Sequence, residues 1–242
     1  MGRRGKFITF EGLDGTGKST QMRELASVLR AAGHKVVETR EPGGTATGEK
    51  IRRVLLDSST EGLAPLAEMA LMFASRAQHI EEVILPALEH GQIVLCDRFT
   101  DSTEAYQGSG RKLGSAVVME LHRLLCGGLQ PDLTILLESD PAKSLGRARR
   151  RNRQSQAANL SKTNLSKTNS GSNKSAGKHP DENRFEQQNR AFFVRVREGY
   201  RVIAAREPQR VVAVDASGSP GQTHRRIVEV LGRRIKLAAG NV

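Results

Sequence analysis

The stretch Gly12-Leu13-Asp14-Gly15-Thr16-Gly17-Lys18-Ser19, followed by Thr20, decides the fold of this chain. Its glycines at the first and sixth positions, ahead of Lys-Ser, fit the phosphate-binding loop pattern. The segment Lys6–Phe10 before it has the composition of a short buried strand, and the apolar residues after it recur at helical spacing as far as Gly33. Because strand, loop and helix follow in the order that this motif requires, we expect a nucleotide phosphate site here.

The loop residues have distinct expected roles in such a site. Glycines let the backbone turn so that its N–H groups face a phosphate. Lys18 is expected to reach the terminal phosphates, and the Ser19 hydroxyl to ligate Mg²⁺. The alternative, a glycine-rich turn without a ligand, is disfavoured because motif and context agree. The residues expected to surround the nucleotide phosphates are Gly12, Leu13, Asp14, Gly15, Thr16, Gly17, Lys18, Ser19 and Thr20.

Composition limits the class of protein. A length of 242 residues suits one α/β domain with a full core. The net charge of +12 would suggest nucleic-acid binding if it covered one face, but residues 141–180 alone hold five Arg and five Lys and no Asp or Glu. The positive charge is therefore concentrated in one segment, and we expect no nucleic-acid partner.

Cysteine usage and hydropathy indicate the compartment. Cys96 and Cys126 lie in apolar settings and are expected to be core thiols of a reducing environment. No run of eighteen apolar residues occurs, and no apolar signal segment precedes the first strand. We expect a cytoplasmic protein that does not associate with a membrane.

Strands and helices are predicted to alternate along the chain. Further strands are expected at 35–39, 92–96, 133–137 and 211–215. Helices are expected at 45–56, 63–88 with an interruption at Pro86, 113–125, 141–153, 184–206 and 222–237. This order predicts an α/β fold, a five-stranded parallel sheet with helices on both faces. Its polar clusters follow strand ends, where such sheets bind ligands, at the phosphate loop, Arg40-Glu41, Asp97-Arg98 and Asp215-Ala216-Ser217.

One segment departs from this alternation. Residues 154–178 contain Asn-Leu-Ser-Lys-Thr twice in succession, at 159–163 and 164–168, among Ser, Asn, Gly and Gln. With almost no large apolar residues, the segment cannot offset the entropy of ordering. We interpret the whole chain, 1–242, as a single domain with a flexible low-complexity insertion at about 154–178.

At this point the chain resembles a known family, the bacterial thymidylate kinases, over about Lys6 to Leu231 except for the insertion. The resemblance rests on Phe10-Glu11 with the phosphate loop, Thr39-Arg40-Glu41-Pro42-Gly43-Gly44, Phe73-Ala74-Ser75-Arg76-Ala77-Gln78-His79, Asp97-Arg98-Phe99, Ser102-Thr103-Glu104-Ala105-Tyr106-Gln107-Gly108, Pro131-Asp132-Leu133-Thr134 and Asn183-Arg184-Phe185-Glu186. The ordered set is specific, whereas the phosphate loop alone is shared by many enzymes. The resemblance implies a P-loop kinase fold with a mobile lid.

The activity that the resemblance implies is transfer of the ATP γ-phosphoryl group to dTMP, giving dTDP and ADP, within dTTP synthesis. Two anions must be brought into line, so positive charge must screen both. Lys18 would hold the donor, and Asp97 would hold Mg²⁺ directly or through water. Arg98 resembles the family arginine that clamps the acceptor phosphate, and Arg40 and Arg52 are further phosphate ligand candidates.

The resemblance also implies residues that recognise the acceptor. Asp14 would contact the region of the sugar 3′-hydroxyl. Phe73 resembles the aromatic residue that stacks on thymine, although some relatives carry it four residues before the arginine, at the position of Met72. Arg76 would bond the exocyclic oxygen of the base. Thr103, Tyr106 and Gln107 correspond to residues that contact the base edge and sugar, and Tyr106 would exclude a ribose 2′-hydroxyl.

An arginine-rich segment corresponds to the family's lid. By resemblance, Arg147 would pack on adenine, and Arg149 or Arg151 would supply positive charge to the transition state when the lid closes. The family also forms homodimers through helices that correspond to 63–88. Two other functions stay open from the residues: a P-loop kinase for another nucleotide, and a basic nucleic-acid-binding P-loop ATPase.

Overall fold

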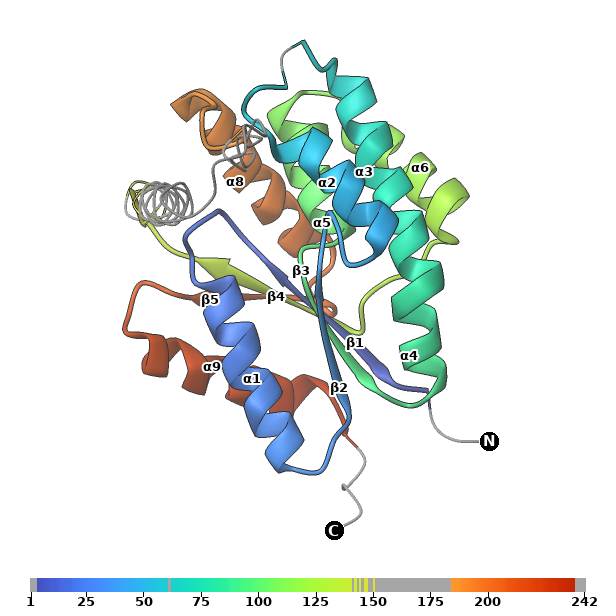
Figure 1. Cartoon of the computed structure of the whole chain (residues 1–242). Coiled ribbons are helices and arrows are strands. Elements are labelled where there is room, and N and C mark those ends of the chain that lie inside the picture. Colours follow the sequence, from blue (N-terminus) through green and yellow to red (C-terminus); the bar gives the residue numbers. More distant parts are fainter. Residues whose placement is uncertain are drawn as a thin grey trace, which may run out of the picture.

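The computed structural model describes residues 4–60, 62–140, 142, 144, 146–147, 150 and 184–237. Five strands form one all-parallel sheet in the order β2-β3-β1-β4-β5. The strands are β1 (Lys6–Glu11), β2 (Val36–Arg40), β3 (Ile93–Asp97), β4 (Leu133–Glu138) and β5 (Val211–Asp215). This confirms the predicted sheet. β1 lies at its centre, so the phosphate loop leaves the middle of the sheet (Figure 1).

Helices cover both faces of the sheet, as predicted (Figure 1). On one face lie α1 (Lys18–Ala31) and α9 (Pro220–Arg234). On the other lie α2 (Ala46–Leu56), α3 (Pro65–His79), α4 (Leu85–Glu89), α6 (Ser115–Cys126) and α8 (Arg190–Arg206). The alternation of side chains along β1 explains the division, because Ile8 and Phe10 pack toward α1 whereas Phe7 packs toward α3.

The long helix predicted at 63–88 has a more detailed structure. Between α3 and α4 the chain forms a π-helical segment, η1 (Ile80–Ile84). Pro86 therefore falls in the first turn of α4, where a missing N–H is tolerated. The interruption expected at this proline is absent, because helical structure continues through it. The helix predicted at 184–206 begins later, at Arg190, with the Asn189 side chain accepting a hydrogen bond from Phe192 N (2.9 Å).

Two short elements had no predicted counterpart. After β3 the chain continues through α5 (Thr100–Thr103) into a π-helical segment, η2 (Glu104–Gly110). This stretch is buried although it carries polar residues such as Asp101, Glu104 and Gln107. It packs against α8. Some of its polar side chains line the cavity described below, and others form ion pairs, Glu104 with Arg206 and Asp101 with Arg210. The predicted helix at 141–153 and the insertion at 154–178 lie largely or wholly outside the described residues.

Candidate active site

The phosphate loop keeps its shape through glycine conformations and one lysine. Gly12, Gly15 and Gly17 all have positive φ, at 126°, 80° and 101°. A Cβ at Gly12 would lie 2.4 Å from Leu137 O, so only glycine lets β1 and β4 approach here. Lys18 Nζ donates to Gly12 O and Leu13 O at 3.1 Å, which places the ammonium group inside the loop. Burial, together with repulsion from Arg98, lowers the pKa of Lys18.

A hydroxyl and a carboxylate meet beside this loop. Ser19 Oγ, on the first turn of α1, donates to Asp97 Oδ2 at 2.8 Å because β1 and β3 are neighbouring strands. The other carboxylate oxygen, Asp97 Oδ1, is buried and has no hydrogen-bond partner within the part of the chain that the structure describes. Hydroxyl and carboxylate oxygens are the donors that Mg²⁺ prefers. The two residues therefore fit a magnesium ion, with one oxygen still lacking a partner.

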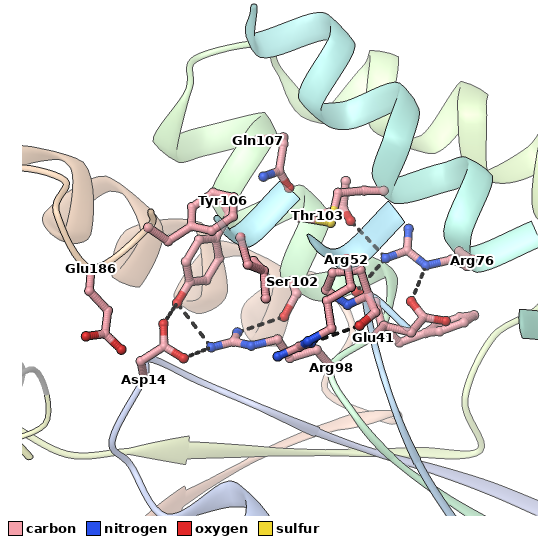
Figure 2. Close-up of a pocket in the computed structure, with 15 residues that line it drawn as sticks. Asp14, Glu41, Arg52, Arg76, Arg98, Ser102, Thr103, Tyr106, Gln107 and Glu186 are labelled. Atoms are coloured by element: carbon pink, nitrogen blue, oxygen red, sulfur yellow. Dashed lines mark hydrogen bonds and ion pairs between the residues drawn. The ribbon is translucent and has the colours of Figure 1, made fainter. Parts of the chain in front are cut away.

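Arg98 sits where the loop meets the main cavity. Its backbone φ of 73° is in the left-handed region, which is unfavourable for a residue with a Cβ. Its Nη2 donates to Asp14 Oδ1 at 2.7 Å and to Tyr106 Oη at 3.3 Å, and its guanidinium carbon lies 5.0 Å from the centre of the Tyr106 ring (Figure 2). Burial opposes ionisation of Asp14, but Arg98 and Lys18 prevail and hold its pKa well below the usual range.

Glu11 lies behind Arg98 and supports it from two sides. Its Oε1 accepts from Phe99 N (2.8 Å), which fixes the residue after the strained Arg98. Its Oε2 accepts from Ser102 Oγ (2.5 Å) and Tyr200 Oη (2.8 Å), and both hydroxyls in turn accept from Arg98 Nη1, at 3.0 and 3.3 Å. Burial and the nearby Asp101 charge raise the pKa of Glu11 to about 7, although Arg98 opposes them.

Arg76 closes the far end of the cavity from α3. Its side chain is only 2% exposed, and it donates to Glu41 Oε2 (2.7 Å), Thr103 Oγ1 (2.9 Å) and Phe99 O (3.2 Å). Its remaining nitrogen, Nη1, is buried and has no partner among the described residues. A guanidinium fixed on one side with a spare donor suits a hydrogen-bond acceptor on a ligand.

Between these groups lies a cavity of about 240 Å³. Figure 2 shows Asp14 and Arg98 along one side of it and Gln107, Thr103 and Arg76 along the other. Arg52, from α2, also lines it and donates to Pro42 O at 2.8 Å. The cavity is thus polar at both ends.

The cavity also has apolar walls. Met72 and Tyr106 contribute to them, and Phe185 comes from the segment before α8. Phe185 meets the Tyr106 ring edge to face, with 5.8 Å between ring centres. A planar ring bound between the polar ends would therefore contact thioether and aromatic groups.

The structure brings together most of the predicted site residues and excludes two. The cavity is lined by Asp14, Arg52, Arg76, Arg98, Thr103, Tyr106 and Gln107. Phe73 is not among its lining residues; it is fully buried in the same core cluster as Phe7 and Phe99, and Met72 lines the cavity instead. Arg40 is exposed and pairs with Glu49 (3.0 Å). Neither Phe73 nor Arg40 therefore lines the cavity.

The lid arginines are only partly described. Arg147 Nη2 lies 3.4 Å from Ser139 Oγ and Ser144 Oγ, near the end of β4. Arg149 and Arg151 lie outside the described residues, as does the insertion at 154–178.

Several residues that support the cavity wall were missed by sequence reasoning. Glu11 and Ser102 form hydrogen bonds behind Arg98, and Tyr200, on α8, bonds both of them. Glu11 stands immediately before the loop, and an acidic residue at the end of a buried central strand was the available signal. Tyr200 gave none, because its place on an apolar helix stripe is typical of core residues.

A second buried group of possible metal ligands, Glu41, His79 and Cys96, is occupied by internal contacts. Glu41 accepts from Arg76 and bonds His79 Nδ1 at 2.9 Å, and His79 Nε2 bonds Thr39 Oγ1 at 2.6 Å. The group links the loop after β2 with β3 and α3 at the cavity wall, which Glu41 also lines. In the described part of the chain no helix is long and apolar enough to cross a membrane.

Comparisons with known proteins agree with this geometry. The family model for thymidylate kinase matches residues 10–176. A thymidylate kinase of Solidesulfovibrio magneticus is 44% identical over 227 residues, covering 94% of this chain and 99% of that protein. One from Desulfovibrio desulfuricans is 48% identical over 214 residues, covering 88% of this chain and 89% of that protein. The crystal structure of a thymidylate kinase from Ehrlichia chaffeensis superposes with a TM-score of 0.68 at 28% identity, covering 94% of this chain and 99% of the other.

Proposed function

The chain belongs to the thymidylate kinase family, and from this premise we propose how its residues divide the work of transferring the ATP γ-phosphoryl group to dTMP. The reaction gives dTDP and ADP, and neither alternative function is favoured. We call the phosphate loop with Asp97 the donor site, and the cavity of about 240 Å³ the acceptor pocket. The two meet at Asp14 and Arg98.

At the donor site, the loop N–H groups and Lys18 bind the ATP phosphates. Ser19 and Asp97 would hold Mg²⁺, which would neutralise charge on the phosphates. The orphaned Asp97 Oδ1 supports this proposal. Arg147 is proposed to contact the nucleotide near the end of β4, and Arg149 and Arg151 are proposed to bring further positive charge to the transferring group.

At the near end of the acceptor pocket, Arg98 and Arg52 bind the dTMP phosphate. Arg98 is already oriented by Asp14 and by two hydroxyl groups, so little ordering is needed when the anion arrives. Asp14 is placed for the sugar, and its low pKa keeps it ionised as a hydrogen-bond acceptor for a hydroxyl. Tyr106 fills the space beside it, which would crowd a ribose 2′-hydroxyl.

At the far end, the polar groups match the edge of thymine. Arg76 Nη1, the buried donor without a partner, is proposed to bond the exocyclic O4. Gln107 is proposed to accept from N3–H, with Thr103 holding Arg76 in place. Met72 takes the contact with the ring face that was first assigned to Phe73.

Assembly and location are also proposals. Apolar side chains are exposed on α3 and α6, including Leu66 (57%) and Leu124 (60%), and these helices contact each other. Such a surface supports a homodimer through this face, which light scattering of the purified chain would test. The free buried thiols of Cys96 and Cys126 support a cytoplasmic location.

The observation that carries the acceptor assignment is the orphaned Arg76 donor at one end of a pocket whose other end meets the phosphate loop. A coupled assay that compares dTMP with dUMP, UMP, CMP, AMP and GMP as acceptors tests it. We expect the highest kcat/KM for dTMP. For dUMP, kcat/KM should be lower because one methyl contact is lost, which is worth about 1–3 kcal/mol, and for UMP it should be lower still. Equal turnover of UMP and dTMP would remove Tyr106 from its role.

A further inference from the structure

A buried carboxylate lies behind one wall of the acceptor pocket. Glu68, on α3, is fully buried and does not line the pocket. Its Oε1 accepts from Gln107 Nε2 at 2.8 Å and, at a longer 3.2 Å, from Arg111 Nε. Its Oε2 accepts from Arg111 Nη2 at 3.0 Å and from Arg184 Nη2 at 2.7 Å. Glu68 therefore joins the pocket wall to two guanidinium groups on other segments.

The contact with Glu68 fixes which end of the Gln107 amide faces the pocket. A carboxylate paired with two guanidinium groups only accepts hydrogen bonds, so the Gln107 NH₂ must point toward it. The opposite end of the amide is Oε1, and Gln107 lines the pocket from η2. No donor in the described part of the chain bonds to this oxygen, whereas the Nε2 side is taken. In Figure 2, Gln107, Thr103 and Arg76 follow one another along one side of the pocket.

The fixed amide gives the pocket a defined hydrogen-bond pattern. It offers an acceptor at Gln107 Oε1 and a donor at Arg76 Nη1. Thymine presents the complementary pair, N3–H beside the O4 acceptor. Cytosine presents the reverse pair, an N3 lone pair beside an amino group. A flipped Gln107 amide would match thymine at one position only.

We propose that Glu68 is a positioning residue for base selection, which holds the Gln107 amide so that its oxygen faces the pocket and favours a base protonated at N3. The inference rests on the proposed contact between Gln107 and the base. It assigns selectivity to a residue that does not itself touch the substrate.

The variant Glu68→Gln tests this directly. Two guanidinium donors meet at the place of Oε2, at 3.0 and 2.7 Å, and only one, Arg111 Nε, lies at that of Oε1, at 3.2 Å. The amide oxygen of the new side chain would therefore take the place of Oε2, and its NH₂ would face Gln107. Gln107 must then turn its own oxygen away from the pocket and present NH₂ to the base. The kcat/KM for dTMP should fall and that for dCMP should rise, because each base then meets one matched and one mismatched group. We expect the ratio of the two kcat/KM values to drop about tenfold to a hundredfold.

A matched control and a rescue separate positioning from loss of stability. Glu104→Gln makes the same change in a buried carboxylate of η2 that pairs with Arg206 and does not line the pocket, and it should leave the ratio unchanged. The exchange variant Glu68→Gln with Gln107→Glu again places an acceptor oxygen toward the base. It should regain most of the preference for dTMP that the single variant loses.

The Glu68 substitution removes a charge shared by two arginines, so folding is checked by circular dichroism and thermal melting. Glu68→Asp keeps that charge and only draws the carboxylate away from Gln107, and its ratio should fall severalfold. A folded Glu68→Gln, or if that variant does not fold a folded Glu68→Asp, with the wild-type ratio overturns the inference. A wild-type chain that uses dCMP as well as dTMP would instead contradict the proposed base contacts.

Discussion

The donor site and the acceptor pocket are built in different ways. The donor site is mostly backbone from one continuous stretch between β1 and α1, whose shape depends on glycine conformations and Lys18. The acceptor pocket is mostly side chains that come from the loop after β1, from α2, α3, α5 and η2, and from the segment before α8. A motif can encode the first, whereas the second exists only when the fold brings distant residues together.

The difference extends to charge. Within the acceptor pocket, Arg98 is paired with Asp14, and Arg76 with Glu41. At the donor site, Lys18 contacts only backbone carbonyls of its own loop among the described residues. The donor site thus keeps a positive charge for the phosphates, while the pocket holds neutralised pairs that orient their members. Variants in the two regions should therefore fail in different ways.

The largest effect is expected at the donor site. Lys18→Met keeps the apolar stem and removes the ammonium group. Because this charge acts on the transferring group whatever the acceptor, kcat should fall about 10²–10³-fold with dTMP and by a similar factor with dUMP. Steady-state kinetics with both acceptors provide the check. A loss confined to dTMP would place Lys18 in acceptor recognition and erase the distinction between the regions.

A smaller, acceptor-specific loss is expected for Arg98→Ala. Losing a charge-assisted hydrogen bond to a phosphate costs about 1.5–3 kcal/mol, so kcat/KM for dTMP should fall about 10- to 100-fold. The KM for ATP should stay near the wild-type value, since Arg98 faces Asp14 and the pocket. If kcat/KM for dTMP is unchanged, Arg98 does not bind the acceptor.

Glu11 makes the free energy of unfolding of the chain depend on pH. Its pKa is raised from 4.5 to about 7 in the folded chain, chiefly by burial and by Asp101. Between these values the folded state binds more protons than the unfolded state, so this group's contribution to stability falls as pH rises. We expect the free energy of unfolding of wild type, relative to Glu11→Gln, to drop by about 2–3 kcal/mol from pH 5 to pH 8. Urea unfolding at several pH values measures it, and a constant difference would contradict the raised pKa.

The smallest effect is expected at Arg40. This residue was predicted as a phosphate ligand, but its guanidinium is exposed and paired with Glu49. Because Arg40 does not line the acceptor pocket, Arg40→Ala should leave kcat/KM for dTMP within about twofold. The lost exposed ion pair should change stability by only about 0–1 kcal/mol. A tenfold loss would show that Arg40 turns into the pocket when dTMP binds.

The contrast between the two regions also explains what could be predicted from the sequence. The strands and the phosphate loop follow from local patterns, and all five strands are present. The helical structure of Thr100–Gly110 was not predicted, although three of its residues were expected at the site. Its polar side chains are buried because they make contacts with distant residues, such as that of Gln107 with Glu68, and no periodicity in the sequence reveals such contacts. Phe73 and Met72 are adjacent on α3, and a difference of one residue moves a side chain about 100° around the helix, from pocket to core.

Glu11 and Glu68 show the same limit. Each is an ordinary acidic residue in the sequence, and each acts on a pocket residue through a hydrogen bond between distant segments. The resemblance to the family identified residues expected to touch the substrates. The residues that hold them in place became visible only with the fold.

A crossed binding experiment tests the separation of the two sites most directly. Calorimetric titration measures Kd for dTMP without ATP, and for a non-hydrolysable ATP analogue with Mg²⁺, in wild type, Lys18→Met and Arg98→Ala. We predict that Lys18→Met raises the Kd for the analogue about tenfold or more and leaves the Kd for dTMP within about threefold of wild type. Arg98→Ala should do the reverse. If either variant weakens both ligands to the same extent, donor and acceptor binding are not separable and the account is contradicted.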